Sequence, residues 1–250
     1  MPDALSLTLS NWGNSIDEFS EADKEAIQDL FDKLSLTTDF LSKESIKQTK
    51  EIVDSKYLQK TIKDFEILLS RTTGGDSLEK SWQKFLKENS WVFSTLFAQP
   101  VIFFKDEAYV GGKTIDNKDG KFSDFLVKNS LSNNVSFVEI KTHLTSILKN
   151  TPYRGTDVFS ATEHLTGSIT QVMNQRDNLQ KEFYMAKGKS KEHFEVFNSK
   201  CVVLIGKLDL LSDEQKSSFE LFRSNSKDVE IVTFDELLVK MTSLQDILNK

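Results

Sequence analysis

Apolar residues recur every three or four positions through the first part of the chain, and this spacing predicts helices. One such segment follows Ser20, and its apolar face consists of Ala26, Leu30, Phe31 and Leu34. A second covers residues 43–70, with Ile46, Ile52, Val53, Leu58, Ile62 and Leu68 on one side. The turn-forming residues 72–75 (TTGG) then mark a boundary. We therefore expect a helical accessory or oligomerisation region over residues 1–72 and a second domain over residues 73–250.

Helices and strands alternate after this boundary. Asp76, with Glu79 three residues later, has the spacing of a capping box and predicts the start of a helix. The buried stripe of that helix is expected to consist of Leu78, Trp82, Phe85 and Leu86. Further helices are predicted over about 160–185, from Ser212 with Gln215 as its cap partner, and from Thr233 with Glu236 as its cap partner.

Short runs rich in β-branched and aromatic residues predict the strands. After a bend that begins at Ser90, strands are expected up to Phe104 and, as a separate short piece, over 108–110. Four more are expected over residues 121–128, 135–141, 201–206 and 230–234. Because helices and strands are interleaved in this order, we expect an α/β fold with a mixed sheet flanked by helices.

The two central strands predict a cluster of charged side chains. A symmetric turn over Asn129–Asn134 would make 121–128 and 135–141 an antiparallel hairpin, with Asp124 directly opposite Glu139. Side chains alternate between the faces of a strand, so Glu139 and Lys141 share a face and Asp124 joins them. Directly opposed residues have Cβ atoms about 4.5–5.5 Å apart, and two like charges at that distance are destabilising unless something compensates them.

A divalent cation would compensate the two carboxylates. Mg²⁺ binds through one or two carboxylates, keeps several waters and can hold a phosphate oxygen. Such an ion activates water for attack on a phosphodiester, and a lysine beside it stabilises developing negative charge. A divalent cation such as Mg²⁺ at Asp124 and Glu139 is therefore one interpretation of this cluster. The same three charged residues could equally form a salt bridge on a hairpin without any catalytic role.

Six segments lie in a fixed order across residues 77–245: LEKSWQKFLKENSWVF, FSDFLV, VSFVEIK, HLTGSITQVMNQRDNL, CVVLIGK and VEIVTFDELL. Together they resemble the Shedu anti-phage defence nuclease family, which has a PD-(D/E)xK nuclease domain, usually behind a variable N-terminal region. The resemblance implies a restriction-endonuclease-like mixed sheet. It also implies metal-dependent cleavage or nicking of phage or plasmid DNA by a homo-oligomer, a dimer or tetramer, in bacterial immunity.

The resemblance also implies individual roles. Asp124 and Glu139, with Ile140 as a third metal-binding residue, would bind Mg²⁺ or Mn²⁺, and Lys141 would be the catalytic lysine. Gln171, on the helix after the hairpin, would support the lysine or the phosphate, and Glu79 would be an additional acidic residue near the metal. Glu79 has a competing explanation as part of the capping box. Gln175 lies on the same helix face as Gln171, so the sequence does not decide which glutamine reaches the site.

Several other residues invite interpretation. Ser123 stands where the superfamily name places proline. His143 follows Lys141 by two positions and is more simply explained as a bystander. No pattern of cysteine and histidine ligands suggests zinc. The lone Cys201, in an apolar run, is expected to pack in the core.

Composition and charge bear on where the protein is located and what it binds. The chain of 250 residues carries a net charge of −6, which does not by itself identify a nucleic-acid-binding protein, although residues 141–200 are locally basic. No apolar segment is long enough to span a bilayer, and the N-terminus lacks the pattern of a signal peptide. We therefore expect a cytoplasmic protein without a membrane partner. The alternative to an endonuclease is a nucleic-acid-binding or sensor module that keeps the fold without cleaving.

Overall fold

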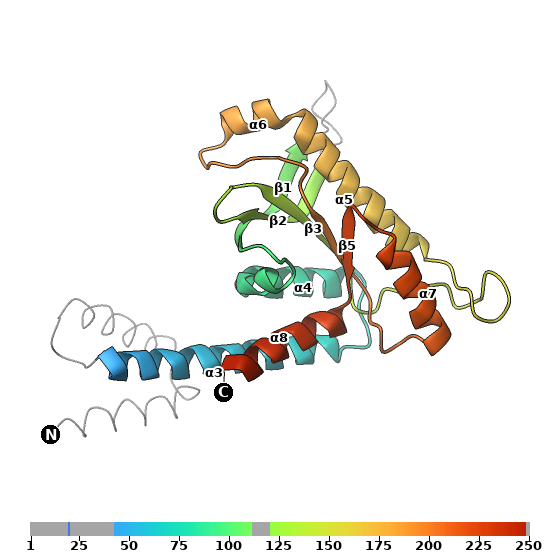
Figure 1. Cartoon of the computed structure of the whole chain (residues 1–250), viewed down its shortest axis with the longest axis horizontal. Coiled ribbons are helices and arrows are strands. Elements are labelled where there is room, and N and C mark those ends of the chain that lie inside the picture. The colour runs from blue at the N-terminus through green and yellow to red at the C-terminus, as the bar shows by residue number, and fades with distance from the viewer. Residues whose placement is uncertain (1–19, 21–42, 112–120, 249–250) are drawn as a thin grey trace. The chain divides into compact units, whose positions relative to one another are not determined.

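The computed structural model describes residue 20 and residues 43–111 and 121–248 (Figure 1). The helix predicted directly after Ser20 lies outside these residues. The chain divides into two compact units, Met1–Ile62 with Gln245–Lys250, and Lys63–Leu244. The second unit contains the whole sheet. Among the described residues, no helix is long and apolar enough to cross a membrane.

A five-stranded mixed sheet, ordered β1-β2-β3-β4-β5, forms the centre of the second unit. Its strands are β1 (Val101–Gly111), β2 (Lys121–Asn129), β3 (Val135–Ile140), β4 (Cys201–Leu204) and β5 (Val229–Val232). The first three are antiparallel neighbours, and β3, β4 and β5 run parallel. The expected α/β class is confirmed. The separate strand expected at 108–110 is wrong, because those residues continue β1 through a register shift.

Helices connect and cover these strands. They are α3 (Lys43–Leu69), α4 (Asp76–Glu88), the short 3₁₀ helix η2 (Ser90–Thr95), α5 (Glu163–Lys181), α6 (Phe183–Lys189), α7 (Asp213–Ser224) and α8 (Phe234–Leu248). Helix α3 confirms a helical N-terminal region within the described residues. The long helix expected over 160–185 is instead divided into α5 and α6 at Glu182. Thr162 caps α5 by accepting a hydrogen bond from the Leu165 N–H.

The capping box expected at Asp76 and Glu79 is wrong. Gly75, with a φ of 73°, is the N-cap of α4, and no side chain caps the helix. Its carbonyl oxygen accepts the N–H groups of Leu78 and Glu79. Glycine is suited to this position because its backbone adopts positive φ without steric cost. The Glu79 carboxylate is therefore free of a capping role.

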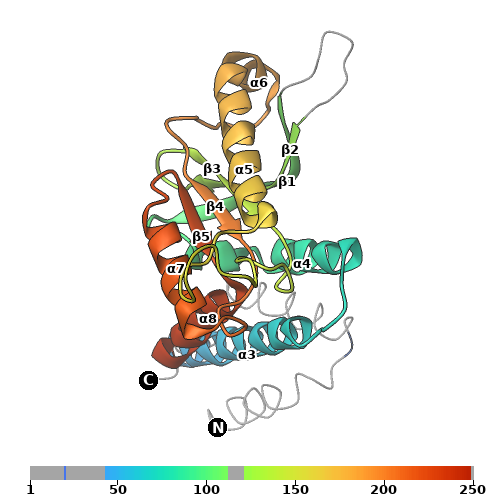
Figure 2. The same cartoon turned by 90° about the vertical axis from the view of Figure 1, so that its right-hand side faces the viewer.

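The two faces of the sheet are buried by different elements. Helix α5 crosses strands β1 to β4 on one face (Figure 2), where Leu126, Phe137 and Val172 belong to a single apolar core. On the opposite face, Phe125 packs against Phe93 of η2, with ring centroids 4.9 Å apart. The hairpin residues predicted for this second face, Phe125, Val127, Val138 and Ile140, are all buried. The hairpin is thus anchored in the core.

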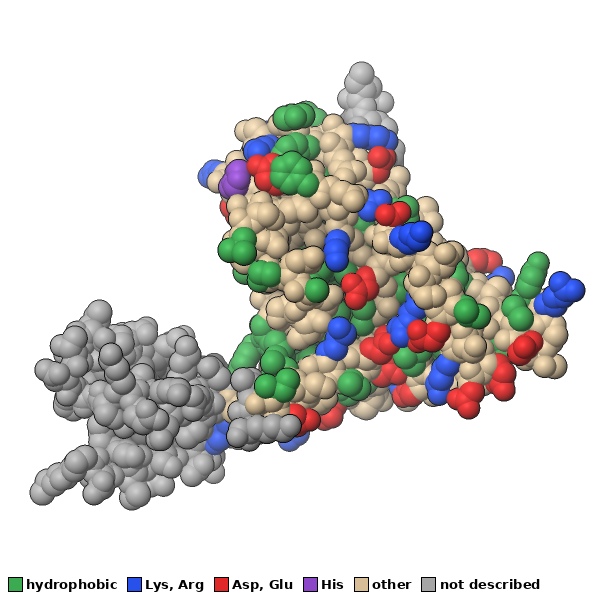
Figure 3. All heavy atoms as spheres, in the orientation of Figure 1, with side chains coloured by type: hydrophobic (Ala, Val, Ile, Leu, Met, Phe, Trp, Pro, Cys, Tyr) green, Lys and Arg blue, Asp and Glu red, His purple; other side chains and the backbone are tan. Residues whose placement is uncertain are grey.

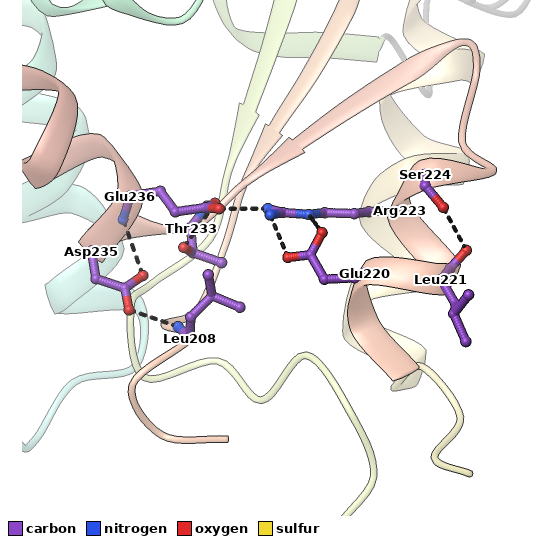
Figure 4. A network of polar contacts seen from close by, with 8 residues as sticks. All are labelled: Leu208, Glu220, Leu221, Arg223, Ser224, Thr233, Asp235 and Glu236. Atoms are coloured by element: carbon purple, nitrogen blue, oxygen red, sulfur yellow. Dashed lines mark hydrogen bonds and ion pairs between the residues drawn. The ribbon is translucent and has the colours of Figure 1, made fainter. Parts of the chain in front are cut away.

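The cap pair predicted at Ser212 and Gln215 is confirmed as a full capping box, and Thr233 and Glu236 pair at the start of α8 through the Glu236 side chain. The Ser212 hydroxyl and the Gln215 side chain exchange hydrogen bonds with each other's backbone N–H at the start of α7. Glu236 accepts hydrogen bonds from the N–H and hydroxyl of Thr233 at the start of α8. Arg223 of α7 also donates to Glu236, over 2.7 Å, so one guanidinium connects the two helices (Figure 4).

Gly206, two residues after the end of β4, should tolerate no side chain. Its φ is 64°, and an added Cβ would lie 2.7 Å from the Thr145 carbonyl oxygen and 2.7 Å from Ile147. We expect Gly206→Ala to lower the free energy of unfolding by about 2–5 kcal/mol, since left-handed strain and overpacking add. Chemical denaturation would measure the loss.

Gly155→Ala is the matched control. Gly155 has a similar φ of 61°, but its added Cβ would approach only a flexible carboxylate, that of Asp157. We expect this variant to lose only the strain, about 1–2 kcal/mol. Equal losses in the two alanine variants would contradict the steric explanation for Gly206.

Candidate active site

The hairpin has the register that the sequence predicts. Phe125 lies opposite Val138 and Leu126 opposite Phe137, which continues to Asp124 beside Glu139. The turn is fixed locally, because the Asn129 side chain accepts hydrogen bonds from the N–H groups of the two residues at its tip. Register and alternation therefore bring both carboxylates to the face of the sheet that α5 covers.

Asp124 lies where the two strands separate. The regular pairing of β2 with β3 ends at Phe125 and Val138. Asp124 is the residue before Phe125 on β2. Its carboxylate Oδ2 accepts a hydrogen bond from the backbone N–H of Ile140 over 2.8 Å. Its other oxygen, Oδ1, accepts a hydrogen bond of 3.1 Å from the Gln83 amide on α4. Asp124 thus takes the place of a backbone acceptor and is itself fixed by a helix.

Glu139 is fully buried, with 0% of the residue exposed, and is held through both oxygens. Oε1 accepts a hydrogen bond of 3.0 Å from the Lys141 ammonium, and Oε2 accepts one of 3.0 Å from the Gln175 amide of α5. The Lys141 ammonium also lies 3.7 Å from an oxygen of Glu79 on α4. Four of the predicted site residues, Glu79, Asp124, Glu139 and Lys141, are therefore brought together.

Of the two glutamines on α5, Gln175 reaches this cluster. Its amide nitrogen donates to Glu139 and also to the carbonyl oxygen of Phe122, over 2.8 Å. Gln175 is only 2% exposed, yet its own amide oxygen has no hydrogen-bond partner in the described structure. Gln171 lies one turn earlier on α5, is exposed, and lines a groove beside the cluster.

Burial and neighbouring charges shift the pKa values of the charged residues in this cluster. Burial, together with the nearby Glu139, raises the pKa of Asp124 to about 7. Burial also raises the pKa of Glu139 above its ordinary value. For Lys141, burial lowers the pKa, but the carboxylates of Glu139, Glu79 and Asp124 together outweigh it and the net pKa is raised. Two buried acids therefore face one ammonium, and a further proton or cation would be favourable.

The chemistry of this donor set fits a hard divalent cation. Asp124 and Glu139 offer the one or two carboxylates through which Mg²⁺ is commonly held, together with water and phosphate oxygens. Within the described part of the chain, no three or more Asp, Glu, His or Cys side chains form a ready-made metal site. The remaining ligands would therefore have to be backbone oxygens such as that of Ile140, water and substrate.

A second set of hydrogen bonds holds the segment that follows β3. The Trp82 indole N–H donates to Nδ1 of His143 over 3.0 Å, and Nε2 of His143 lies 2.8 Å from the carbonyl oxygen of Arg71. Since Nδ1 accepts, Nε2 must carry the proton and donate to Arg71. His143 is buried, and burial lowers its pKa. It is therefore a neutral structural residue that holds α4 close to the segment after Lys141.

Sequence reasoning missed one member of the site, Gln83. It lies one helical turn after Glu79, so both side chains project from the same face of α4. That spacing was the available signal. Glutamine is common on exposed helix surfaces, however, and only the placement of α4 shows that its amide meets Asp124.

Residues 76–238 match the family model described as the C-terminal part of the Shedu protein SduA. The chain belongs to the Shedu family. It is also 42% identical over 176 residues to the Shedu protein SduA of Bacillus cereus (strain B4264), which covers 68% of this chain and 46% of that relative. The chain therefore spans about half the length of the curated Shedu relative that it matches. All of the clustered carboxylates, the lysine and both orienting glutamines lie within the matched Shedu region.

A cavity along β5 lies away from this cluster. A space of about 830 Å³ lies along β5, bordered by Arg223 and Glu236 among others, and none of the clustered acids lines it. On the face drawn in Figure 3, acidic and basic side chains of the described residues are interspersed rather than gathered into one basic patch. Neither the cavity nor the surface charge therefore offers a better candidate site than Asp124 and Glu139.

Asp124→Asn should stabilise the metal-free protein at high pH. The folded pKa of about 7 lies above the unfolded value of 3.8, so the folded state holds the proton more tightly. Stability from this group is therefore complete below about pH 4 and is lost as the pH rises to about 7. The asparagine cannot ionise, and we expect the Tm to rise by roughly 2–4 °C at pH 8, for about 1 kcal/mol.

Thermal unfolding in EDTA at pH 5 and pH 8 would test this expectation. The difference in Tm between Asp124→Asn and wild type should grow with pH. Asp157→Asn, in an exposed loop, is the control and should show no such growth. A variant that loses stability at pH 8 would show that the Asp124 carboxylate is needed in its charged form even without a metal.

Proposed function

We propose that this protein is a DNA endonuclease that depends on Mg²⁺ or Mn²⁺ and acts in defence against phage. The observation that carries the proposal is the pair of buried carboxylates, Asp124 and Glu139, with Lys141 hydrogen-bonded to one of them over 3.0 Å. Membership of the Shedu family supports the same conclusion. The chemistry would be that of the PD-(D/E)xK class, working on phage or plasmid DNA as a homo-oligomer.

Asp124, Glu139 and the backbone oxygen of Ile140 would hold the cation. A bound divalent cation supplies two effects, polarisation of the phosphate and activation of a bound water. The surrounding side chains set the geometry. Gln83 orients Asp124, and Gln175 orients Glu139. Buried carboxylates that are held in this way lose little freedom when they take up an ion.

Lys141 would act through its charge. Its raised pKa keeps the ammonium protonated at neutral pH, so it favours negative charge that develops on a phosphate rather than accepting a proton from water. Glu139 and Glu79 hold the ammonium from two sides, at 3.0 and 3.7 Å. Glu79 would therefore serve as a positioning residue for the lysine.

Lys141→Ala should abolish cleavage. Wild-type protein with Mg²⁺ or Mn²⁺ is expected to nick a supercoiled plasmid, and loss of the ammonium should reduce the rate by about 100-fold or more. Gel electrophoresis of the plasmid over time measures the rate. Lys149→Ala, in an exposed loop, is the matched control and should cleave like the wild type.

Equal cleavage by wild type and Lys141→Ala would refute this assignment. Calorimetry with Mn²⁺ adds an independent readout, because binding should be lost in Asp124→Asn and in Glu139→Gln. A wild type that binds DNA but neither cleaves it nor binds Mn²⁺ through these residues would instead be a non-cleaving recognition module.

The two glutamines of α5 should differ in their kinetic effects. We expect Gln175→Ala to lower kcat by about 10- to 100-fold, since Glu139 would lose its second hydrogen bond and become less well positioned. Gln171→Ala should leave kcat within a few-fold of wild type, because this exposed side chain lies outside the cluster. The opposite order would restore Gln171 as the supporting glutamine.

A further inference from the structure

A groove of about 660 Å³ lies beside the candidate site, on the outward face of α5. Figure 2 shows α5 facing the viewer. The helix contributes one stripe of small and neutral polar residues, which are Thr166, Gly167, Thr170, Gln171 and Asn174. Phe122 of β2 and Gln175 line the same space. At 1.5 Å per residue, the stripe is about 12 Å long.

Gln175 joins this groove to the carboxylates. The same side chain that lines the groove donates to Glu139 over 3.0 Å, and its buried amide oxygen has no hydrogen-bond partner in the described structure. A buried acceptor without a donor is costly, and such groups point to a ligand or water that supplies the missing hydrogen bond. The groove therefore opens towards the place where a scissile phosphate would lie.

Gly167 is unexplained by the packing of the protein itself. Glycine within a helix costs about 1 kcal/mol relative to alanine. An added Cβ at Gly167 would meet no atom within 4 Å, so nothing inside the protein excludes a side chain there. A glycine in that setting is what a close approach by an external backbone would require.

Phe122 supplies an exposed aromatic surface beside the site. It is 55% exposed and packs edge-on against Tyr109, itself 42% exposed, with ring centroids 5.7 Å apart. Phe122 lies two residues before Asp124 on β2, so it shares that face of the strand, about 7 Å away along the chain. An aromatic side chain there can stack on a base next to the phosphate at the carboxylates.

We propose that the α5 groove holds a single DNA strand with unstacked bases and guides it to Asp124 and Glu139. The strand backbone passes closest to α5 at Gly167, and one base stacks on Phe122. Among the described residues that line the groove, the acidic Glu163 is the one charged side chain, so no basic side chain there neutralises a phosphate. Binding therefore rests on stacking and neutral hydrogen bonds, and its affinity depends weakly on salt. This inference rests on the proposed function for its site but concerns recognition rather than cleavage.

Binding of fluorescent oligonucleotides to the full chain in EDTA tests the groove without cleavage. Wild type should bind a single-stranded oligonucleotide more tightly than a duplex of the same sequence. Phe122→Ala should weaken that binding by about 5- to 100-fold, the range for loss of one stacking contact, whereas Phe122→Trp should retain it. Fluorescence anisotropy gives each Kd.

Gly167→Ala separates recognition from folding. The substitution should raise the Tm, because alanine favours a helix, and yet weaken strand binding by about fivefold or more. Gly188→Ala in α6 is the matched control: its added Cβ also meets nothing within 4 Å, but it does not line the groove. It should bind like the wild type.

The outcomes distinguish this inference from the proposed function. Equal affinity of Gly167→Ala and Gly188→Ala, or tighter binding of the duplex than of the single strand, would overturn the groove even if wild type cleaves plasmid. A strand that binds in the Gly167- and Phe122-dependent manner, without any cleavage in Mg²⁺ or Mn²⁺, would support the groove and refute the nuclease. Tighter binding of an RNA oligonucleotide than of DNA would overturn the choice of DNA.

Discussion

The burial of two neighbouring carboxylates is the constraint around which the second unit is arranged. Asp124 and Glu139 would repel each other in a medium of low dielectric constant, and each must be hydrogen-bonded to remain charged there. Their partners come from several different elements: Gln83 from α4, Gln175 from α5, and the Ile140 N–H and Lys141 from β3 and its end. Displacing one of these elements would leave a buried acid without compensation. The geometry of the site therefore depends on how the helices pack on the sheet.

The bracing extends beyond the charged residues. Trp82 packs against Phe234, with ring centroids 4.4 Å apart, and donates its indole N–H to His143. One indole thus connects α4, the segment after β3 and the start of α8. Because α4 also carries Glu79 and Gln83, the position of those side chains relative to Lys141 depends on an apolar contact made by a neighbouring residue of the same helix. Packing in the apolar core therefore fixes the positions of these site residues.

The sequence contains enough to predict the centre of the site but not its periphery. Alternation along two strands and a short turn determine which residues face each other, so the pairing of Asp124 with Glu139 follows from the sequence alone. The choice between Gln171 and Gln175 does not, because it depends on how far α5 is displaced along its axis over the sheet. Gln83 depends in the same way on the rotation of α4. The capping box predicted at Asp76 was wrong because the backbone of Gly75 takes up the first N–H groups of the helix.

The six-residue turn Asn129–Asn134 sets the register of β2 against β3, and this limits which register shifts the site can tolerate. A strand slipped by one residue presents its opposite face, so a one-residue slip of β2 would move Asp124 into the apolar layer against η2 and bring Phe125 or Ser123, depending on its direction, opposite Glu139. A slip of two residues would keep the facing pattern but place Leu126 or Phe122, rather than Asp124, opposite Glu139. The exact register that this turn sets, and not only the facing pattern, therefore holds the two carboxylates together: a slip of β2 by one or by two residues would dismantle the site with every site residue still present in the gene.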